Sequence, residues 1–137
     1  MDPAALRAAR ERAGLTQHQL ARLVGVAGGE RVSRWELGTS EPRPEILVRL
    51  AKVLDVAALD LLDVADGADL RAVRFAAGLS PSEVAAAAHL SVRTYVRWES
   101  GEGTRLPDSA QVAALAKALK VSQKALLAAF DCTREPR

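Results

Sequence analysis

The sequence has few cysteines and few aromatic residues. Its one cysteine, Cys132, leaves no partner for an internal disulfide or a cysteine metal cluster, which suits a reducing compartment. Aromatic residues make up 4% of the 137 residues, whereas hydrophobic residues as a whole reach 49%. A folded core must therefore consist mainly of Ala, Leu and Val, and this composition favours packed helices over sheets.

Long apolar segments and catalytic patterns are also missing. No run approaches about 18 apolar residues, and the N-terminus lacks the apolar region of a signal peptide, so we expect a cytoplasmic protein outside the membrane. We find no paired carboxylates, no nucleophile with a neighbouring base and no phosphate-binding loop, and neither His18 nor His89 has a ligand cluster nearby. We therefore expect no cofactor and no metal, and an enzyme is the least favoured class.

The positive charge is concentrated in the second half of the chain. Residues 1–66 carry a net charge of −1, residues 67–137 carry +3, and the whole chain carries +2. Most of the basic residues are arginines, whose planar guanidinium groups suit bidentate contacts with phosphate or guanine. The total charge says little about partners, but its distribution makes the second half the more basic one.

One seven-residue phrase occurs twice, as VSRWELG at residues 32–38 and as YVRWESG at residues 95–101. Similar segments flank the two copies in the same order. LRAARERAGL (6–15) pairs with LRAVRFAAGL (70–79), and LAKVLDV (50–56) pairs with LAKALKV (115–121). An internal repeat of this length predicts two copies of one supersecondary unit, with the seam near residues 63–69.

The repeat predicts an all-α chain with two tandem domains. We expect about five short helices in each copy, a first domain over residues 1–65, a second over residues 66–130 and a disordered tail over residues 131–137. Thr16 and Ser80 are expected to be N-caps, because small hydroxyl side chains accept hydrogen bonds from exposed N–H groups there. Gly38 and Gly101 follow the Trp-Glu phrases and fit helix C-caps.

The two copies differ in the turn before the Trp-Glu helix. Residues 26–32 of the first copy contain one residue more than the matching residues 90–95 of the second copy, and they include Gly28-Gly29. We therefore expect a looser turn in the first copy and a Trp-Glu helix that begins late.

The order of these motifs resembles a known family. Leu15-Thr16-Gln17, a short turn, Arg34-Trp35-Glu36 and a trailing Leu-Ala-x-x-Leu-x-Val are similar to the phage-repressor-type helix-turn-helix of the Cro/C1 (XRE) family of bacterial and phage regulators. The resemblance covers nearly all of both copies. It implies two five-helix DNA-binding domains, in which the third helix enters the major groove of double-stranded DNA and the second helix lies across the backbone.

The resemblance implies base contacts from one face of each Trp-Glu helix. Arg93 and Arg97 lie four residues apart, and an arginine in the major groove prefers guanine, with roughly 1–3 kcal/mol of discrimination. Val92 can touch a thymine methyl group. The first copy has Arg34 and Glu30 at the matching positions, and Glu30 can accept from cytosine or only complement the helix N-terminus. The alternative for the arginines is a solvated helix surface.

The resemblance also implies contacts with DNA phosphates, the alternative being ordinary solvated side chains. Gln17 matches the family position where a side chain and a backbone N–H hold a phosphate. The second copy has Pro81 there, which removes both donors. The predicted backbone contacts are Gln17, Thr16, Arg31, Ser33, Thr39, Arg43, Ser80, Thr94, Thr104 and Arg105.

Two ion pairs between the first and third helices are implied as well. Arg10 with Glu36, and Arg74 with Glu99, resemble the structural ion pair of the family. Removing one partner of a buried pair costs roughly 3–5 kcal/mol, so these residues should hold the fold rather than bind DNA. Tyr95 stands where the family usually has an aliphatic residue, and its hydroxyl is expected to need a partner.

These features favour a sequence-specific DNA-binding transcriptional regulator, most simply a repressor. Single domains of this family usually bind DNA as two-fold dimers. Here we expect the two tandem domains of one chain to replace such a dimer. Because their recognition helices are unlike, the DNA site is expected to be non-palindromic. The rival is a protein-binding adaptor or antitoxin-like module that uses the same fold on a protein partner. The acidic first copy, Gly28-Gly29 and Pro81 favour this rival, and a homodimer of whole chains stays open.

Overall fold

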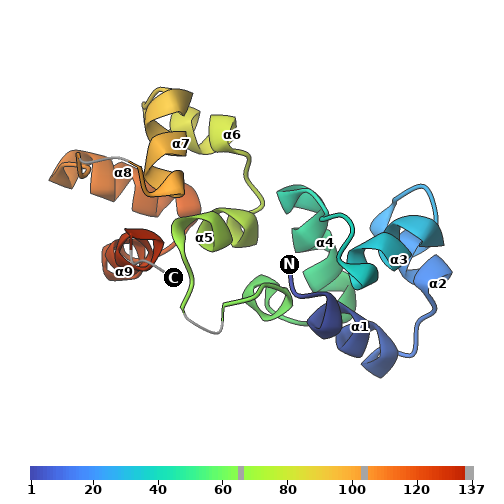
Figure 1. Cartoon of the computed structure of the whole chain (residues 1–137). Coiled ribbons are helices and arrows are strands. Elements are labelled where there is room, and N and C mark those ends of the chain that lie inside the picture. The colour runs from blue at the N-terminus through green and yellow to red at the C-terminus, as the bar shows by residue number, and fades with distance from the viewer. Residues whose placement is uncertain (65–66, 103–104, 135–137) are drawn as a thin grey trace. The chain divides into compact units, whose positions relative to one another are not determined.

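The computed structural model describes residues 1–64, 67–102 and 105–134, and all regular secondary structure within these ranges is helical, as the composition predicted (Figure 1). The chain divides into two compact units, Met1–Asp63 and Val64–Arg137. This division falls two residues before the predicted boundary between residues 65 and 66.

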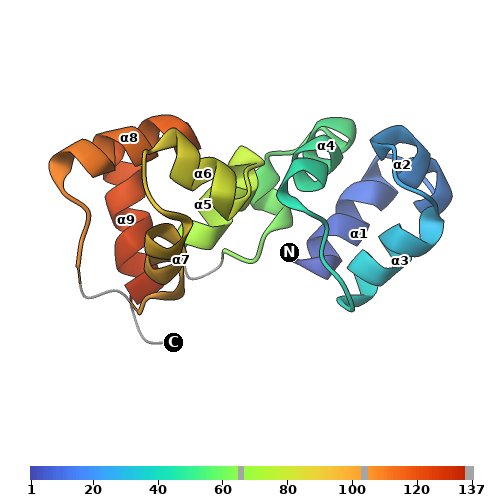
Figure 2. The same ribbon diagram turned by 90° about the horizontal axis from the view of Figure 1, so that it is seen from above.

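The first unit consists of four α-helices and a short 3-10 helix. They are α1 (Pro3–Arg12), α2 (Gln17–Val24), α3 (Gly29–Leu37), α4 (Pro44–Leu54) and η1 (Ala58–Leu61). Its core is made of apolar side chains from these helices, and Leu6, Leu20, Val32, Leu47 and Leu50 are fully buried. Figure 2 shows α1 to α4 packed around this common centre, with a short turn between α2 and α3.

Helix boundaries in the first unit follow from local capping. Asp2 accepts hydrogen bonds from the N–H groups of Ala4 and Ala5 at the start of α1. Thr16 caps α2, as predicted, and forms a capping box with Gln19. α3 ends at Gly38, whose φ of 77° is a left-handed conformation that glycine adopts without strain.

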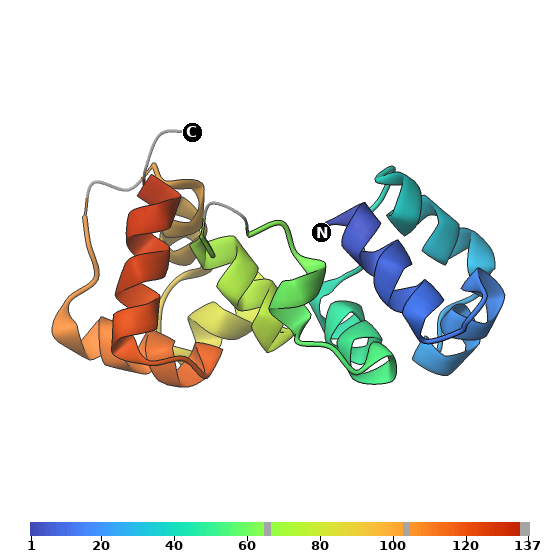
Figure 3. The ribbon, with the colours of Figure 1, turned by 90° about the horizontal axis from the view of Figure 1, so that it is seen from below.

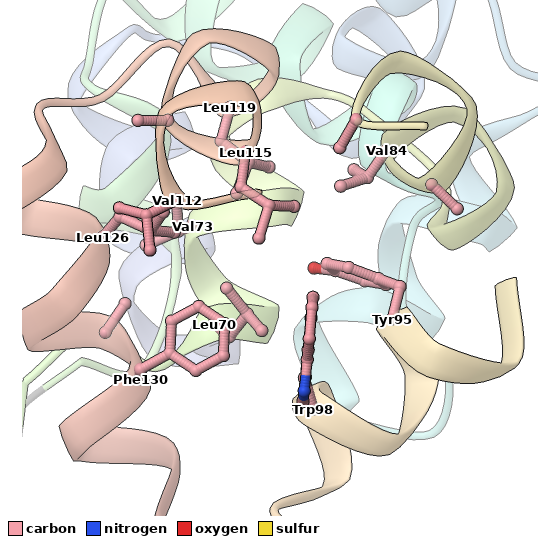
Figure 4. Packing of buried hydrophobic residues seen from close by; sticks show 14 residues of the cluster. Leu70, Val73, Val84, Tyr95, Trp98, Val112, Leu115, Leu119, Leu126 and Phe130 are labelled. Carbon is pink, nitrogen blue, oxygen red and sulfur yellow. The ribbon is translucent and has the colours of Figure 1, made fainter. Parts of the chain in front are cut away.

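The second unit consists of five α-helices. They are α5 (Leu70–Ala77), α6 (Pro81–Ala87), α7 (Val92–Ser100), α8 (Ser109–Leu119) and α9 (Gln123–Arg134). Their buried residues form one cluster, in which Trp98 meets Phe130 edge-on with the ring centroids 5.8 Å apart (Figure 4). Leu70, Tyr95 and Leu115 are fully buried in the same cluster. One aromatic contact within many aliphatic ones agrees with the low aromatic content.

The expected disordered tail is wrong for residues 131–134, because α9 continues to Arg134. The Thr133 hydroxyl accepts a hydrogen bond from the backbone N–H of Leu70 (2.9 Å) and donates one to the carbonyl oxygen of Ala129 (2.8 Å). The end of α9 is thereby tied to the start of α5. Figure 3 shows α9, drawn in red, against the other helices of this unit. Residues 135–137 lie outside the described residues.

The fifth helices of the two units differ in kind. In the first unit this element is η1, a 3-10 helix of four residues, whereas α9 of the second unit has 12 residues. Leu61 and Leu62 bring η1 into the core, and the backbone N–H of Asp2 donates to the carbonyl oxygen of Leu61 at 2.9 Å. The start of the chain therefore helps to hold η1 in place.

Candidate nucleic-acid interface

In the second unit, α6 and α7 form two helices joined by a turn of residues 88–91. The turn passes through His89, whose φ of 57° is left-handed. It ends at Ser91, whose hydroxyl accepts from the backbone N–H of Thr94 (3.1 Å) and donates to the hydroxyl of Thr94 (2.8 Å). At its other end α7 stops at Gly101, with φ of 76°, as predicted. Both ends of α7 are thus fixed by local contacts.

The inner face of α7 is anchored in the core. Tyr95 is fully buried and Trp98 is 7% exposed. The indole N–H of Trp98 donates to the carbonyl oxygen of Arg105 at 2.7 Å, so the segment after α7 is fastened to the same face. Because one side of the helix is held in this way, the opposite side is left for solvent or a partner.

A buried ion pair between α5 and α7 fixes the rotation of α7. The Arg74 guanidinium donates through Nε and Nη2 to the two carboxylate oxygens of Glu99, at 2.8 and 2.7 Å, and through Nη1 to the carbonyl oxygen of Leu79 at 3.0 Å. Burial works against the charge on Arg74, but the hydrogen bond and the charge of Glu99 outweigh it and raise the pKa of Arg74. The pair expected from the sequence is therefore present.

The outer face of α7 carries two arginines and two valines. Arg93 and Arg97 are exposed, and their guanidinium groups form no ion pair or hydrogen bond with any other described residue. Val92 is 44% and Val96 is 46% exposed. The sequence interpretation included three of these residues and missed Val96, whose signal was its position four residues after Val92. Thr94, a predicted backbone contact, is half-buried and bound to the helix cap.

In the first unit, α2 and α3 form the matching pair of helices. The prediction that this Trp-Glu helix begins late is wrong. α3 and α7 both have nine residues, and each begins six residues before its tryptophan, α3 at Gly29 and α7 at Val92. The extra residue of the first copy lies in the turn, where residues 26–28 follow the left-handed Gly25. Between the left-handed residue and the helix there are thus three residues in the first unit and two after His89 in the second, and the register of the helix is unchanged.

Gly29 allows α3 to begin at the same distance from its tryptophan as α7. A Cβ atom on Gly29 would lie 3.1 Å from both the Cα and the backbone N of His18, in the first turn of α2. The start of α3 therefore lies against the backbone of α2 at a distance that only glycine allows without displacement. This contact joins residues that are distant in sequence, which is why the local pattern did not predict it.

The ion pair of the first unit resembles that of the second but has a third member. Arg10 donates through Nε and Nη2 to the carboxylate of Glu36, at 2.7 and 3.0 Å, and the hydrogen bond with Glu36 raises the pKa of Arg10. The Gln17 amide donates to the same carboxylate at 3.3 Å. Gln17, predicted to hold a phosphate, is thus half-buried and directed at the ion pair in this structure.

Two further predicted backbone contacts are helix caps. The Thr16 hydroxyl accepts from the backbone N–H of Gln19 (3.0 Å), and the Ser80 hydroxyl accepts from that of Glu83 (3.2 Å). The return hydrogen bond from the backbone of Ser80 to the Glu83 carboxylate lowers the pKa of Glu83. In both caps the hydroxyl oxygen is the acceptor, so its own proton is left to donate to an anion.

A cleft of about 430 Å³ in the first unit brings together three predicted contact residues, Arg31, Arg34 and Arg43, all of them exposed. Its other lining residues are Trp35, Ser40, Glu41, Pro42, Glu45 and Ile46. Glu41 is bound to the N-terminal ammonium group at 2.6 Å, so its charge is compensated within the unit. The cleft follows the loop between α3 and α4 and has a mixed charge with an excess of arginine.

The remaining predicted residues lie around these elements. Ser33 is half-buried and Glu30 is exposed on α3. The Thr39 hydroxyl donates to the carbonyl oxygen of Arg34 at 3.2 Å, so it closes the end of α3. Arg105 is exposed in the segment after α7, and Thr104 lies outside the described residues.

The Tyr95 hydroxyl has no hydrogen-bond partner within the described part of the chain, although the sequence led us to expect one. The ring is packed beside Trp98, and the hydroxyl points into the core (Figure 4). Burial raises the pKa of Tyr95 above its ordinary value, and the negative charge of Glu99 raises it further. The ring of Tyr95 is thus accommodated in the core although its hydroxyl makes no hydrogen bond with a described residue.

No cluster of three or more His, Cys, Asp or Glu side chains suitable for a metal ion occurs in residues 1–64, 67–102 and 105–134. Within the same ranges, every helix is too short or too polar to span a membrane.

Comparisons with known proteins identify the two units separately. A family model described as helix-turn-helix matches residues 6–61, and a second model, described as a helix-turn-helix domain, matches residues 67–130. The matched ranges contain α2 with α3 and α6 with α7, respectively. No curated protein and no solved structure matches the chain.

Proposed function

Because the chain belongs to the XRE-type helix-turn-helix family and carries two of its domains in tandem, we propose that it is a sequence-specific DNA-binding transcriptional regulator, most simply a repressor that occludes a promoter. Proteins of helix-turn-helix families bind DNA and are typically non-enzymatic. The recognition helices are α3 and α7, and each would lie in the major groove of double-stranded DNA.

The outer face of α7 is the observation that carries this proposal. Arg93 and Arg97 stand on a helix whose opposite side is held by Trp98 and by the Glu99–Arg74 ion pair. A helix fixed in rotation by its buried side fixes the direction in which the side chains of its exposed face leave the backbone. Two such arginines, exposed and not bound to another described residue, offer bidentate donors for guanine O6 and N7.

The first unit supports a second and different contact. On α3, Glu30 and Arg34 occupy the positions that Arg93 and Arg97 occupy on α7. A carboxylate accepts from cytosine N4, whereas an arginine donates to guanine, so the two helices would bind unlike half-sites. Arg31 and Arg43 beside the same cleft would contact phosphates and position the unit without selecting sequence.

Selection from a random DNA library with the full-length chain tests the proposal. We expect a motif with two unlike halves about one helical turn apart. Arg97→Ala should relax base preference in one half, with roughly 1–3 kcal/mol lost at the guanine it contacts. Arg34→Ala is the matched variant and should relax the other half. If no sequence is enriched even at low salt, the regulator proposal fails.

The salt dependence of binding provides an independent test. Each phosphate neutralised by an arginine or lysine releases counterions, so log Kd against log salt should be steep. Arg43→Ala should reduce that slope by about one while leaving the preferred sequence unchanged. An unchanged slope would show that the loop after α3 does not contact DNA.

A protein-binding adaptor is the second candidate, and the first unit favours it most. Glu30 is exposed on α3, and two glutamates line the cleft beside its three arginines. A mixed surface of this kind suits a charged protein partner as well as DNA. If the DNA selection enriches only the half-site of α7, we would assign the first unit to a charged protein partner. If it enriches a palindrome, whole chains bind DNA as dimers.

A further inference from the structure

Two parallel stripes of unlike chemistry run along the outer face of α7. Val92 and Val96 lie four residues apart and form an apolar stripe, 44% and 46% exposed. Arg93 and Arg97 lie four residues apart immediately beside them and form a cationic stripe. Each valine is therefore next to an arginine along the length of the helix that would enter the groove.

The exposed valines need an explanation that the helix itself does not supply. Valine is a weaker helix former than alanine or lysine, because its branched Cβ restricts the side chain against the preceding turn. The core of this unit is built from other residues, with Tyr95 and Trp98 on the inner face of α7. Nearly half of each valine side chain is left exposed beside the arginines, so the pair offers an apolar contact to a partner of α7.

The partner must match methyl groups and paired hydrogen-bond donors at adjacent positions. The major-groove edge of DNA has this arrangement, because guanine presents two acceptors and thymine presents its C5-methyl group. A purely apolar protein groove would leave the guanidinium groups of Arg93 and Arg97 without acceptors, which carries a desolvation penalty. The alternation of the two stripes therefore favours DNA over an apolar protein surface.

Resting on the proposed function, we propose that Val96, together with Val92, contacts thymine C5-methyl groups. The half-site bound by α7 then contains thymines next to the guanines contacted by Arg93 and Arg97. Val96 is in this way a specificity-determining residue that selects thymine through its methyl group.

The first unit provides an internal control. The positions on α3 that match Val92 and Val96 are Gly29 and Ser33, which offer no apolar branch. Leu37 is 73% exposed, but it is the last residue of α3, and in this family of motifs the N-terminal part of the recognition helix contacts the bases. The half-site bound by α3 should therefore be insensitive to thymine methyl groups.

Uracil substitution is the test, because uracil pairs as thymine does and lacks only the methyl group. Each thymine of the selected DNA site is replaced by uracil, one position at a time, and Kd is measured with the full-length chain at one salt concentration. The half-site of α7 is the one that Arg97→Ala relaxes. We expect roughly fourfold weaker binding for each contacted methyl in that half, from the transfer free energy of one buried carbon, and no change in the other half.

The Val96→Ala variant completes a double-mutant cycle. It should weaken binding to the thymine site by a similar factor and should lose its sensitivity to uracil at one position. Ser33→Ala is the matched variant on α3. Because Ser33 is a predicted backbone contact, its loss can change Kd itself, but the ratio of Kd for uracil and thymine should equal that of the parent chain at every position. Val96 is exposed and alanine is the better helix former, so the variant should keep the unfolding temperature of the parent chain.

The remaining outcomes show whether the role of the valines, the proposed function or both are wrong. Specific DNA binding with no uracil effect in the α7 half would overturn the role of the valines and leave the regulator proposal intact. A uracil effect that persists in Val96→Ala would show that another residue touches the methyl group. If the parent chain binds no DNA sequence specifically, both proposals are wrong.

Discussion

The helices α3 and α7, which we propose as recognition helices, have the same supporting contacts and differ in the residues that they expose. Both have nine residues, both end at a left-handed glycine, and both are tied by a glutamate to an arginine on the first helix of the unit. Their outer positions carry Glu30 and Arg34 in one case, and Arg93 and Arg97 in the other. The comparison shows that buried contacts set the position of the helix, while the exposed residues are free to differ.

The starts of α3 and α7 also differ in their residues while the two helices keep the same position relative to their tryptophans. α7 begins after Ser91, which caps it through a side-chain hydrogen bond. α3 begins after Gly28, which has no side chain to cap with, and Gly29 lies against α2 instead. One helix is positioned at its start by a local hydrogen bond and the other by a long-range backbone contact, and both reach the same register.

The largest expected effect comes from the ion pairs, where the two units differ by one hydrogen bond. Arg74→Ala leaves the Glu99 carboxylate, 13% exposed, without its cation, and should destabilise the second unit by roughly 3–5 kcal/mol. Arg10→Ala should cost less, because Gln17 still donates to Glu36. Hydrogen exchange, resolved by unit, measures both losses separately.

Arg7→Ala is the control for these two variants. Arg7 pairs with Glu11 at 3.0 Å, but both side chains are more than half exposed, so the loss should stay below about 0.5 kcal/mol. An Arg74→Ala protein that folds normally and binds a different DNA sequence would contradict the structural role of the pair.

A second prediction exchanges the helix starts. Gly29→Val gives α3 the residue that α7 has at Val92, and it should destabilise the first unit by about 1–3 kcal/mol, because the new Cβ would lie only 3.1 Å from backbone atoms of His18 and would force them apart. Chemical denaturation of the variant and the parent measures the difference. The reciprocal Val92→Gly creates no such collision, since Val92 is 44% exposed, and should cost about 1 kcal/mol or less. A gain in stability for Gly29→Val beside a loss for Val92→Gly would show that helix propensity, not the contact with α2, decides the outcome.

Much of the fold could be predicted because its signals are local. The Trp-Glu phrase, the small hydroxyl residues before α2 and α6, and Gly38 and Gly101 each mark a helix end within a few residues of sequence. The Ala, Leu and Val composition predicted the kind of core. The internal repeat then predicted two units, since each phrase returned in the same order.

What the sequence interpretation missed depends on contacts between distant residues. The register of α3 depends on His18, and the helical end of the chain depends on a hydrogen bond from Leu70 to Thr133. Gln17, at the start of α2, faces Glu36 because the second and third helices pack together there. Val96 was overlooked because a single exposed valine on a helix is ordinary, and only its place between two exposed arginines distinguishes it.

A third prediction uses the one tyrosine of the chain, Tyr95, which occupies the place of Val32 in the first unit. Burial raises the pKa of Tyr95 in the folded state. Below the unfolded pKa of about 10 the titration of this residue therefore costs no stability, and above that pH the free energy of unfolding falls as the pH rises. We expect the second unit to lose about 1.4 kcal/mol per pH unit beyond about pH 10 through this residue.

Tyr95→Phe isolates that effect from the titration of lysines. The variant should lack the additional loss at high pH, and at neutral pH it should be as stable as the parent or slightly more stable, because the buried hydroxyl has no hydrogen-bond partner among the described residues. Urea denaturation at pH 8 and pH 11 measures the difference. Identical pH profiles of parent and variant would contradict a raised pKa for this hydroxyl.

The smallest expected effect concerns the uncapped start of α3. Gly28 has φ of 177°, an extended backbone that any residue adopts, and a Cβ atom there would meet nothing within 4 Å. Gly28→Ser would supply the hydroxyl that Ser91 supplies to α7, but the N–H of Arg31 already donates to the Gly28 carbonyl oxygen at 3.2 Å. The gain should therefore be only a few tenths of a kcal/mol.

Gly28→Ala shows whether that gain comes from the cap. Serine and alanine both reduce the freedom of the unfolded chain relative to glycine, but only serine can accept a hydrogen bond at the helix start. If the side-chain oxygen is responsible, the melting temperature should rise for Gly28→Ser and fall for Gly28→Ala. If both variants rise together, the stabilisation comes from the unfolded state, and the missing cap is not what distinguishes the start of α3 from that of α7.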